Sequence, residues 1–189
     1  MVVHAFDSVL DAARAGADWA WERIYSDLAG PVIGYLRVHG AADPEDVAGE
    51  VFLQVVRDLP RFSPATGDVE RDFRAWVFTI VHRRLLDSHR ARSRRPVEPA
   101  DPSVFEPLAD PVGDASDAAD ASVARGRVLA LLGDLPPDQR SVLLLRILGD
   151  MTIEEIARAV GKRAGAVKAL QRRGLKRVSG AYPFAAGER

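Results

Sequence analysis

The stretch that decides the fold is TIEEIARAVGKRAGAVKAL, residues 152–170. It begins with the spacing of a capping box, in which the side chains of Thr152 and Glu155 each accept a hydrogen bond from the other residue's backbone amide. Gly161 follows one short helical segment, at a point where glycine can adopt the left-handed conformation that ends a helix. A second helix is expected from Ala164 to about Ser179. Two short helices joined by a glycine turn predict a helix-turn-helix, which places its second helix in the major groove of DNA.

The second helix of this pair is strongly basic, and no acidic residue occurs between Glu155 and Glu188. In the major groove, lysine and arginine can pair with guanine and glutamine with adenine. We therefore expect base contacts from Lys168, Gln171, Arg172 and Arg173. Basic residues nearer the ends of the helix are expected to contact phosphates instead; they are Lys162, Arg163, Lys176 and Arg177. An ordinary helical hairpin with a solvated basic face is the alternative interpretation.

Upstream of this pair, Pro136-Pro137-Asp138 is expected to open a helix that runs to Gly149, after a shorter helix that ends at Gly133. The composition changes in residues 96–122, which hold five prolines and seven acidic residues but no lysine or arginine. Such a segment can bury few side chains, and its like charges repel, so we expect a flexible linker. The linker separates two helical modules, residues 1–95 and 123–182.

Apolar residues recur at helical spacing throughout the first module, whereas the alternation typical of strands is almost absent. Asp43 and Pro44 give one helix a clear start, because aspartate caps the first turn and proline suits the first helical position. Pro31 is expected to kink or restart an earlier helix. The expected helices cover residues 6–13, 19–36, 43–59 and 73–94, with a loop over 61–72. The expected fold class is therefore all-α.

A second basic cluster ends the first module, and Asp87 is the only acidic residue within it. The cluster consists of His82, Arg83, Arg84, His89, Arg90, Arg92, Arg94 and Arg95. A single basic run is usually a solvated helix face. Two runs in separate modules, joined by an acidic linker, favour a polyanionic partner. Nucleic acid is the obvious candidate, because each neutralised phosphate releases counterions and adds affinity.

The composition also excludes several classes of protein. The formal charge of the 189 residues is −1, so only the distribution of charge points to nucleic acid. The absence of cysteine removes disulfide frameworks, thiolate zinc sites and cysteine nucleophiles. No apolar run approaches the roughly 20 residues that span a bilayer, and the N-terminus does not look like a secretory signal. We therefore expect a cytoplasmic protein without membrane insertion.

Several stretches of the chain resemble the extracytoplasmic-function sigma factors of the sigma-70 family. They are DPEDVAGEVFL at 43–53, FRAWVFTI at 73–80, LPPDQRSVLLLR at 135–146 and GAVKAL at 165–170. Their order and spacing also match, so the resemblance covers the chain from about Trp19 to Val178. It implies that residues 1–95 form sigma domain two, which binds core polymerase and reads and melts the minus-ten element. Residues 123–182 would form domain four, which reads the minus-thirty-five element through its helix-turn-helix.

The resemblance also implies site residues in the first module. Core polymerase would dock on the helix that begins at Asp43, through Asp46, Glu50, Phe52 and Gln54. A specificity loop at Ser63–Glu70 would receive a base flipped out of the non-template strand, at a cost of a few kcal/mol for the extrusion. The implied minus-ten contacts are Ser63, Pro64, Thr66, Trp76, His82, Arg83, Arg84 and Arg90. Trp76 also has the helical spacing of a core residue, which is the interpretation that we favour for it.

The chain departs from the family pattern at several positions. Arg83 replaces an asparagine of the minus-ten helix, and Gly49 replaces a glutamine of the polymerase-binding helix. Gly174 lies inside the recognition helix, where glycine costs about 1 kcal/mol relative to alanine. We therefore expect the recognition helix to bend or fray beyond Gly174.

The expected partners are core RNA polymerase and promoter DNA, with nucleoid association in the holoenzyme and an anti-sigma factor as a further candidate. No cofactor, metal or small-molecule substrate is expected. The chief rival is a helix-turn-helix regulator that is not a sigma factor, but it would lack a sensor domain and would leave the first basic cluster without a role. An enzyme is not expected. A nuclease needs clustered carboxylates to hold magnesium, whereas the acids here lie in the proline-rich linker or at helix starts, and no phosphate-binding loop is present.

Overall fold

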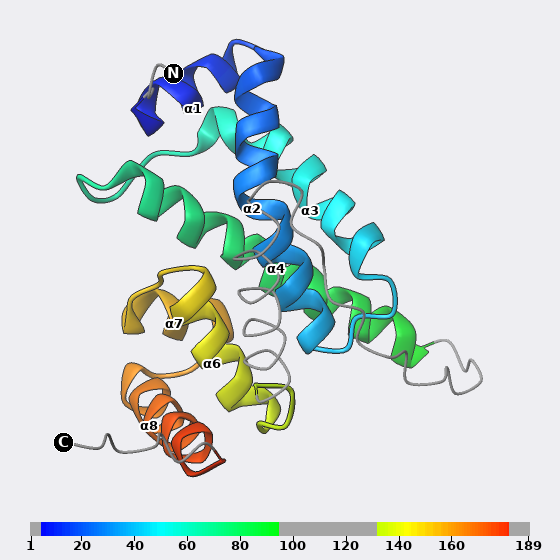
Figure 1. Ribbon diagram of the computed structural model, residues 1–189, viewed down its shortest axis with the longest axis vertical. Helices are drawn as coiled ribbons and strands as arrows, with labels where there is room; N and C mark the ends of the chain where they lie inside the picture. Colours follow the sequence, from blue (N-terminus) through cyan, green and yellow to red (C-terminus); the bar gives the residue numbers. More distant parts are fainter. Residues whose placement is uncertain (1–4, 95–131, 182–189) are drawn as a thin grey trace, which may run out of the picture.

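The structure is a computed structural model that describes residues 5–94 and 132–181. Within these ranges every regular element is a helix, which confirms the all-α fold class (Figure 1). The first module contains α1 (Phe6–Arg14), α2 (Asp18–Val38), α3 (Pro44–Asp58), the 3-10 helix η1 (Leu59–Arg61) and α4 (Val69–Arg94). The second contains α6 (Pro137–Leu148), α7 (Ile153–Val160) and α8 (Ala164–Ala181). The expected linker, residues 96–122, and most of the helix expected before Gly133 lie outside the described residues.

The long helix α4 is central to the first module, and α1, α2 and α3 pack against it. Its apolar residues recur every three or four positions, so they form one stripe that faces the other helices. The buried apolar residues of α4 are Phe73, Ala75, Val77, Phe78, Ile80, Val81 and Leu85. Tyr35 of α2 and Val51 of α3 are fully buried in the same core. This packing fixes α3 and α4, which carry most of the site residues expected in the first module.

Pro31 does not interrupt α2, which is one helix from Asp18 to Val38. The expected restart at Pro31 is therefore wrong. Proline removes the hydrogen bond that its own N–H would have made, and its ring crowds the carbonyl of the preceding turn. Leu28 and Val32, which flank it, are at most 3% exposed, and their burial holds both halves of α2 against the core.

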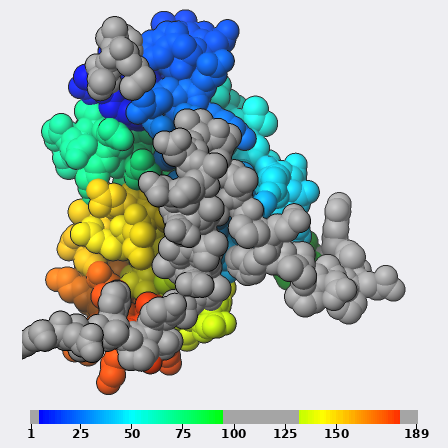
Figure 2. All heavy atoms as spheres, in the orientation of Figure 1, coloured from blue at the N-terminus to red at the C-terminus, as the bar shows by residue number. Residues whose placement is uncertain are grey.

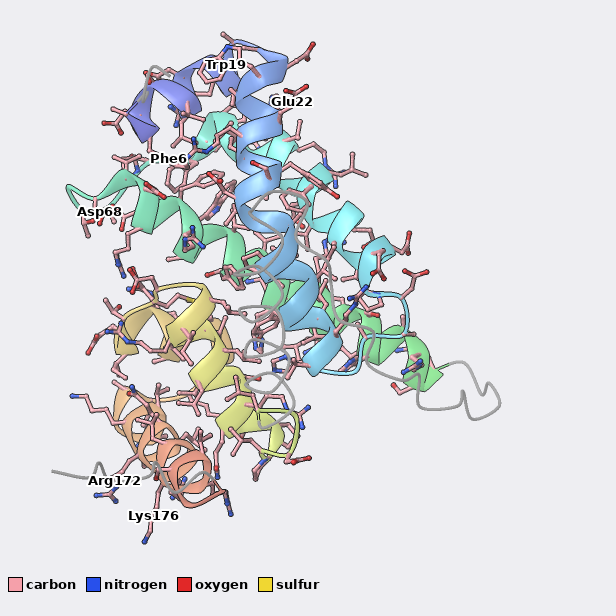
Figure 3. All side chains as sticks on the ribbon, in the orientation of Figure 1. Phe6, Trp19, Glu22, Asp68, Arg172 and Lys176 are labelled. Atoms are coloured by element: carbon pink, nitrogen blue, oxygen red, sulfur yellow. The ribbon has the colours of Figure 1, made fainter. Side chains whose placement is uncertain are left out.

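The helix α4 begins at Val69, four residues before the predicted start at Phe73. Asp68 accounts for the difference, because its Oδ1 accepts a hydrogen bond from the backbone amide of Arg71 at 3.0 Å and so caps the first turn. Figure 3 shows Asp68 at the bend where the chain enters α4. The predicted loop over 61–72 is therefore shorter than expected, and Asp72 lies inside the helix.

The second module has the predicted helix-turn-helix. Both hydrogen bonds of the capping box between Thr152 and Glu155 are present at the start of α7. Gly161 ends α7 with a φ of +67°, in the left-handed region where glycine has no steric penalty. Val167 of α8 is fully buried and Leu170 is 9% exposed, so this side of α8 faces inward.

Gly174 does not end α8, which continues to Ala181. The expectation that the helix frays beyond Gly174 is therefore wrong. A Cβ atom at position 174 would lie 2.9 Å from Cδ1 and 3.2 Å from Cγ of Leu143, which belongs to α6. The glycine is thus a point of close approach between α6 and α8. Packing against α6 stabilises α8 at a position where glycine by itself would destabilise the helix.

The two modules pack against each other, with α6 and α7 touching α2 and α4. In Figure 2 the yellow atoms of the second module lie directly against the green atoms of the first. Arg140 Nη1 donates to the carbonyl of Val38 at 3.1 Å, and His39 Nε2 lies 3.0 Å from Ser141 Oγ. Arg71 of α4 also forms an ion pair with Glu155 of α7. We call this arrangement the closed form.

Candidate nucleic-acid interface

The outward side of α8 carries the residues predicted to read bases. Lys168, Arg172 and Arg173 are exposed, and Gln171 is half-buried. Figure 3 shows the side chains of Arg172 and Lys176 leaving α8 on the side away from the rest of the molecule. The buried and the basic sides of the helix are therefore opposite, as insertion into a major groove requires.

The residues predicted to contact phosphates fall into two groups. Arg163 and Lys176 are exposed. Lys162 Nζ lies 2.9 Å from Asp138 Oδ2, and Arg177 Nη1 donates to Gln139 Oε1 at 2.5 Å, so both of these side chains reach back to α6. DNA binding by Lys162 or Arg177 would compete with these contacts inside the second module.

A pocket of about 450 Å³ lies where the predicted specificity loop meets α4 and α7. The loop contributes Ser63 and Ala65, and α4 contributes Asp72, Trp76, Thr79 and Arg83. The far wall belongs to α7 and the turn before it, through Met151, Glu155, Arg158 and Ala159. The pocket therefore combines aromatic, cationic and hydrogen-bonding groups from both modules.

The structure brings together only some of the residues predicted to contact the minus-ten element. Ser63, Trp76 and Arg83 line the pocket, while Pro64 and Thr66 are exposed on the loop beside it. Trp76 is half-buried and packs on Phe62, with ring centroids 5.1 Å apart. It therefore contributes to the core with one face of the ring and borders the pocket as well.

Three other residues of that group lie elsewhere. His82 is buried, with its Nδ1 2.8 Å from the hydroxyl of Tyr35. Arg84 turns toward α3, where its Nε donates to Gln54 Oε1 at 2.8 Å and its Nη1 lies 3.5 Å from Glu50 Oε2. Arg90 is exposed and pairs with Asp87 at 3.2 Å. Arg84 is thus next to the residues predicted to bind polymerase and not next to the pocket.

The surface of α3 combines exposed acids with exposed apolar side chains. Asp46 and Glu50 are both exposed, and Phe52 is half-buried against Tyr25 at a centroid distance of 4.9 Å. Leu53 of α3 is 64% exposed, and Tyr25 of α2, which contacts Phe52, is 55% exposed. Exposed apolar side chains that lie close together are typical of a surface that binds another protein. The sequence signal was available, because Leu53 falls outside the buried spacing of α3.

The comparisons with known proteins match both modules. The Sigma-70 region 2 family matches residues 24–95, and the Sigma-70, region 4 family matches residues 125–178. The ECF RNA polymerase sigma factor SigD of Mycobacterium tuberculosis is 32% identical over 180 residues, which cover 91% of this chain and 81% of SigD. This chain belongs to the sigma-70 family, in its extracytoplasmic-function (ECF) group, and is a sigma factor.

Two solved structures have a similar fold. One is CnrH in complex with the cytosolic domain of CnrY, with a TM-score of 0.59 and 22% identity, covering 97% of this chain and 100% of that chain. The other is the sigma factor RpoE in complex with the anti-sigma factor NepR from Bartonella quintana, with a TM-score of 0.59 and 18% identity, covering 89% of this chain and 98% of that chain. At identities of 22% and 18%, these two likenesses establish only the fold of the present ECF sigma factor. The sigma-70 family is not, in general, a family of enzymes. No helix within the described ranges is long and apolar enough to cross a membrane.

One histidine of this sigma factor, His39, lies at the interface between the modules and interacts electrostatically with two others, a grouping that sequence analysis did not predict. His39 ends α2, and His82 and His89 are on α4. Burial lowers the pKa of His39 to about 4, and the positive charge of Arg140 acts in the same direction. Burial also lowers the pKa of His82 and of His89. Neutral imidazoles therefore belong to the closed form, and each additional proton there would oppose it.

Proposed function

We propose that this ECF sigma factor binds core RNA polymerase through α3, reads the minus-ten element with the pocket between the 63–68 loop and α4, and reads the minus-thirty-five element with α8. Residues 1–95 would be sigma domain two and residues 123–182 sigma domain four. The observation that carries the proposal is the presence of both surfaces in one chain, a pocket bordered by the loop and an outward basic helix in a helix-turn-helix.

The pocket suits a base taken out of the DNA stack. The loop and α4 supply a lining that includes Trp76, and an aromatic face favours stacking with a base. The side chain of Arg83 is exposed at the pocket and could meet the phosphate that follows the base. Extrusion costs a few kcal/mol, so the contacts in such a pocket must offset that cost before they can select a base.

The closed form places α7 on the wall of this pocket. Glu155 and Arg158 of α7 line the space that the flipped base would occupy. Negatively charged DNA would have to approach the carboxylate of Glu155, which Arg71 holds in place. We infer that α7 leaves this position before the minus-ten element is read, and that polymerase, by holding the two modules apart, favours the open form.

An anti-sigma factor is a further proposed partner. CnrH and RpoE, which share the fold, were solved with CnrY and with the anti-sigma factor NepR respectively. The exposed apolar side chains on α3 provide a surface for either polymerase or an inhibitor, and the two would then compete. We place the protein in the cytoplasm, with polymerase on DNA, and we assign it no catalytic chemistry of its own.

The experiment that tests the function is a reconstitution with purified core polymerase. We expect the full chain to bind core polymerase without DNA and to direct specific transcripts from a promoter library randomised over the minus-ten and minus-thirty-five elements. Binding to DNA fragments without any affinity for core polymerase would instead indicate a regulator that is not a sigma factor.

A further inference from the structure

Asp72 is the only buried acid among residues 5–94 and 132–181, with 7% of its surface exposed. A buried carboxylate is costly unless hydrogen bonds and an opposite charge compensate it. Asp72 lies just outside the FRAWVFTI stretch at 73–80, and none of the roles proposed above uses it. Its burial therefore needs a separate explanation.

The carboxylate of Asp72 is bonded to the specificity loop. Its Oδ2 accepts hydrogen bonds from the backbone amides of Ala65 at 2.8 Å and Thr66 at 2.6 Å, and from Thr66 Oγ1 at 3.0 Å. Its Oδ1 accepts one from Arg71 Nη1 at 2.8 Å. Burial by itself would raise the pKa of Asp72, but the bonds from Thr66 and Ala65 and the charge of Arg71 lower it below its ordinary value. The group is thus an anion whose lone pairs are taken up by the loop.

These bonds determine where the loop lies. Two successive amides point at one oxygen of Asp72, which folds the loop back over the first turn of α4. Thr66 Oγ1 also accepts a hydrogen bond from the amide of Asp68 at 3.2 Å, which closes the second half of the loop. Ala65 and Asp72 both line the pocket, so the bonded group is part of its wall. A pocket selects a ligand only if its walls are held in place.

A role in starting α4 does not account for Asp72. Asp68 already caps that helix through the amide of Arg71, and a helix needs only one residue at this position. The three bonds of Asp72 to Ala65 and Thr66 serve the loop instead.

We propose that Asp72 is a positioning residue for promoter recognition, whose carboxylate holds the 63–68 loop in the shape that admits the flipped minus-ten base. This inference rests on the proposed function of the pocket. Asp72 itself would not touch DNA. It would act through the backbone of Ala65 and Thr66, so its loss should alter which base is accepted and not whether polymerase is bound.

The test compares base preferences of holoenzymes on the randomised promoter library. With Asp72→Ala we expect the preference at one minus-ten position to fall about tenfold, the size of one base contact. Preference in the minus-thirty-five element and affinity for core polymerase should stay as in the wild type. Asp72→Asn keeps an acceptor oxygen but loses the charge, and neutral hydrogen bonds are weaker, so its preference should lie between the two.

The matched control is Arg71→Ala, which removes the ion pairs of Arg71 with Asp72 and Glu155 and leaves the three loop bonds in place. It should keep the wild-type minus-ten preference. A wild-type preference in Asp72→Ala, or a loss spread evenly over both promoter elements or shared by Arg71→Ala, would overturn the positioning role. Should Asp72→Ala melt below the assay temperature, Asp72→Asn decides alone, and an unchanged preference overturns the role. If the wild type itself selects no promoter, it is the proposed function that fails.

Discussion

Arg172 and Lys176 leave α8 one turn apart and in the same direction, yet we expect them to do different work (Figure 3). Arg172 lies at the middle of the helix beside Lys168 and Gln171, where a guanidinium can pair with the edge of a guanine. Lys176 lies a turn further along, where a compact ammonium group meets phosphate. Position along the helix, more than exposure, separates a residue that reads sequence from one that adds affinity.

Replacing Arg172 with alanine should weaken binding to preferred promoters more than to scrambled ones, by about 1–3 kcal/mol of discrimination. Lys176→Ala should weaken both similarly and reduce the slope of log affinity against log salt by about one. The measurement is a pair of salt titrations with holoenzyme on matched and scrambled upstream elements. Equal losses for both variants on both DNAs would contradict this division of α8.

Gly174 provides a second test at the scale of one residue. Alanine there would gain about 1 kcal/mol of helix propensity, but its methyl group would overpack against Leu143, which typically costs about 1–3 kcal/mol. We expect Gly174→Ala to lower the midpoint of urea unfolding. The control is Gly165→Ala in the same helix, where an added methyl group meets nothing within 4 Å. A midpoint for Gly174→Ala at or above that of Gly165→Ala would show that α6 and α8 are not packed this closely.

Single residues also show what the sequence could and could not predict. Asp43, Thr152, Glu155 and Gly161 have local roles, so their spacing was enough to predict the caps and the turn that the structure contains. Gly174 depends on Leu143, far away in the sequence, and propensity alone gave the wrong answer. The direction of Arg84 toward Gln54 likewise depends on how α3 and α4 cross.

At the scale of the helices, α3 offers acids and apolar groups on one exposed surface. Asp46 and Glu50 lie four residues apart and so share a face of the helix. Reversing both to lysine should weaken binding to core polymerase about a hundredfold or more, since like charges across an interface cost several kcal/mol. The far-ultraviolet circular dichroism should remain helical.

The control for this experiment is Asp7→Lys with Asp11→Lys on α1. It has the same spacing, the same change of charge and a first-turn acid in each helix. We expect it to leave core affinity within a few-fold of the wild type. Unchanged affinity in the α3 variant, or an equal loss in the α1 variant, would remove the assignment of α3 as the docking helix.

The boundaries of the helices show a second limit of sequence-based prediction. The existence of each described α-helix followed from apolar periodicity and capping signals, whereas the 3-10 helix η1 was not predicted. The start of α4 did not follow from them, because Asp68 and Asp72 are both good capping residues and periodicity begins only at Phe73. The structure assigns the cap to Asp68 and leaves Asp72 for the loop. Because of this ambiguity, the sequence did not indicate that Asp72 bonds to the loop beside the pocket.

At the scale of the whole molecule, the sequence predicted two modules and a linker, but gave no sign that the modules pack together. Proteases should still cut first within residues 97–121, because a proline-rich acidic segment presents few buried groups. Because the modules pack together in the closed form, the two fragments should also stay associated after cleavage at neutral pH. Size-exclusion chromatography of the digest checks this. A first cut inside either module, or fragments that elute separately at neutral pH, would contradict it.

Acid should open the closed form, because His39 titrates differently in the two states. In the open form its pKa should return to about 6.5, whereas in the closed form it is about 4. Well above pH 6.5 neither form binds the proton, so the equilibrium there does not depend on His39. Between these two values the open form gains the proton and the closed form does not. Lowering the pH from 7 to 5 should therefore shift the equilibrium toward the open form by about twentyfold.

Between pH 7 and pH 5, each group around His39 either opposes the binding of a proton in the closed form or does not titrate. Tyr35 has a raised pKa and stays neutral, and Ser141 does not titrate. Arg140 remains charged and opposes a second cation, while burial lowers the pKa of His82 and His89 as it does that of His39. The pKa of Glu155 is lowered below its ordinary value, so its ion pair with Arg71 persists down to pH 5.

Small-angle scattering of the full chain measures the opening. The radius of gyration should rise between pH 7 and pH 5 while the helical circular dichroism is unchanged. His39→Gln is the control, because glutamine can bond to Ser141 and does not titrate, so most of the rise should disappear. Two results would contradict the role of His39: a radius that does not change with pH, or a rise of equal size in His39→Gln. In the first case the closed form persists without regard to the charge at its interface, and in the second the proton that opens it binds elsewhere.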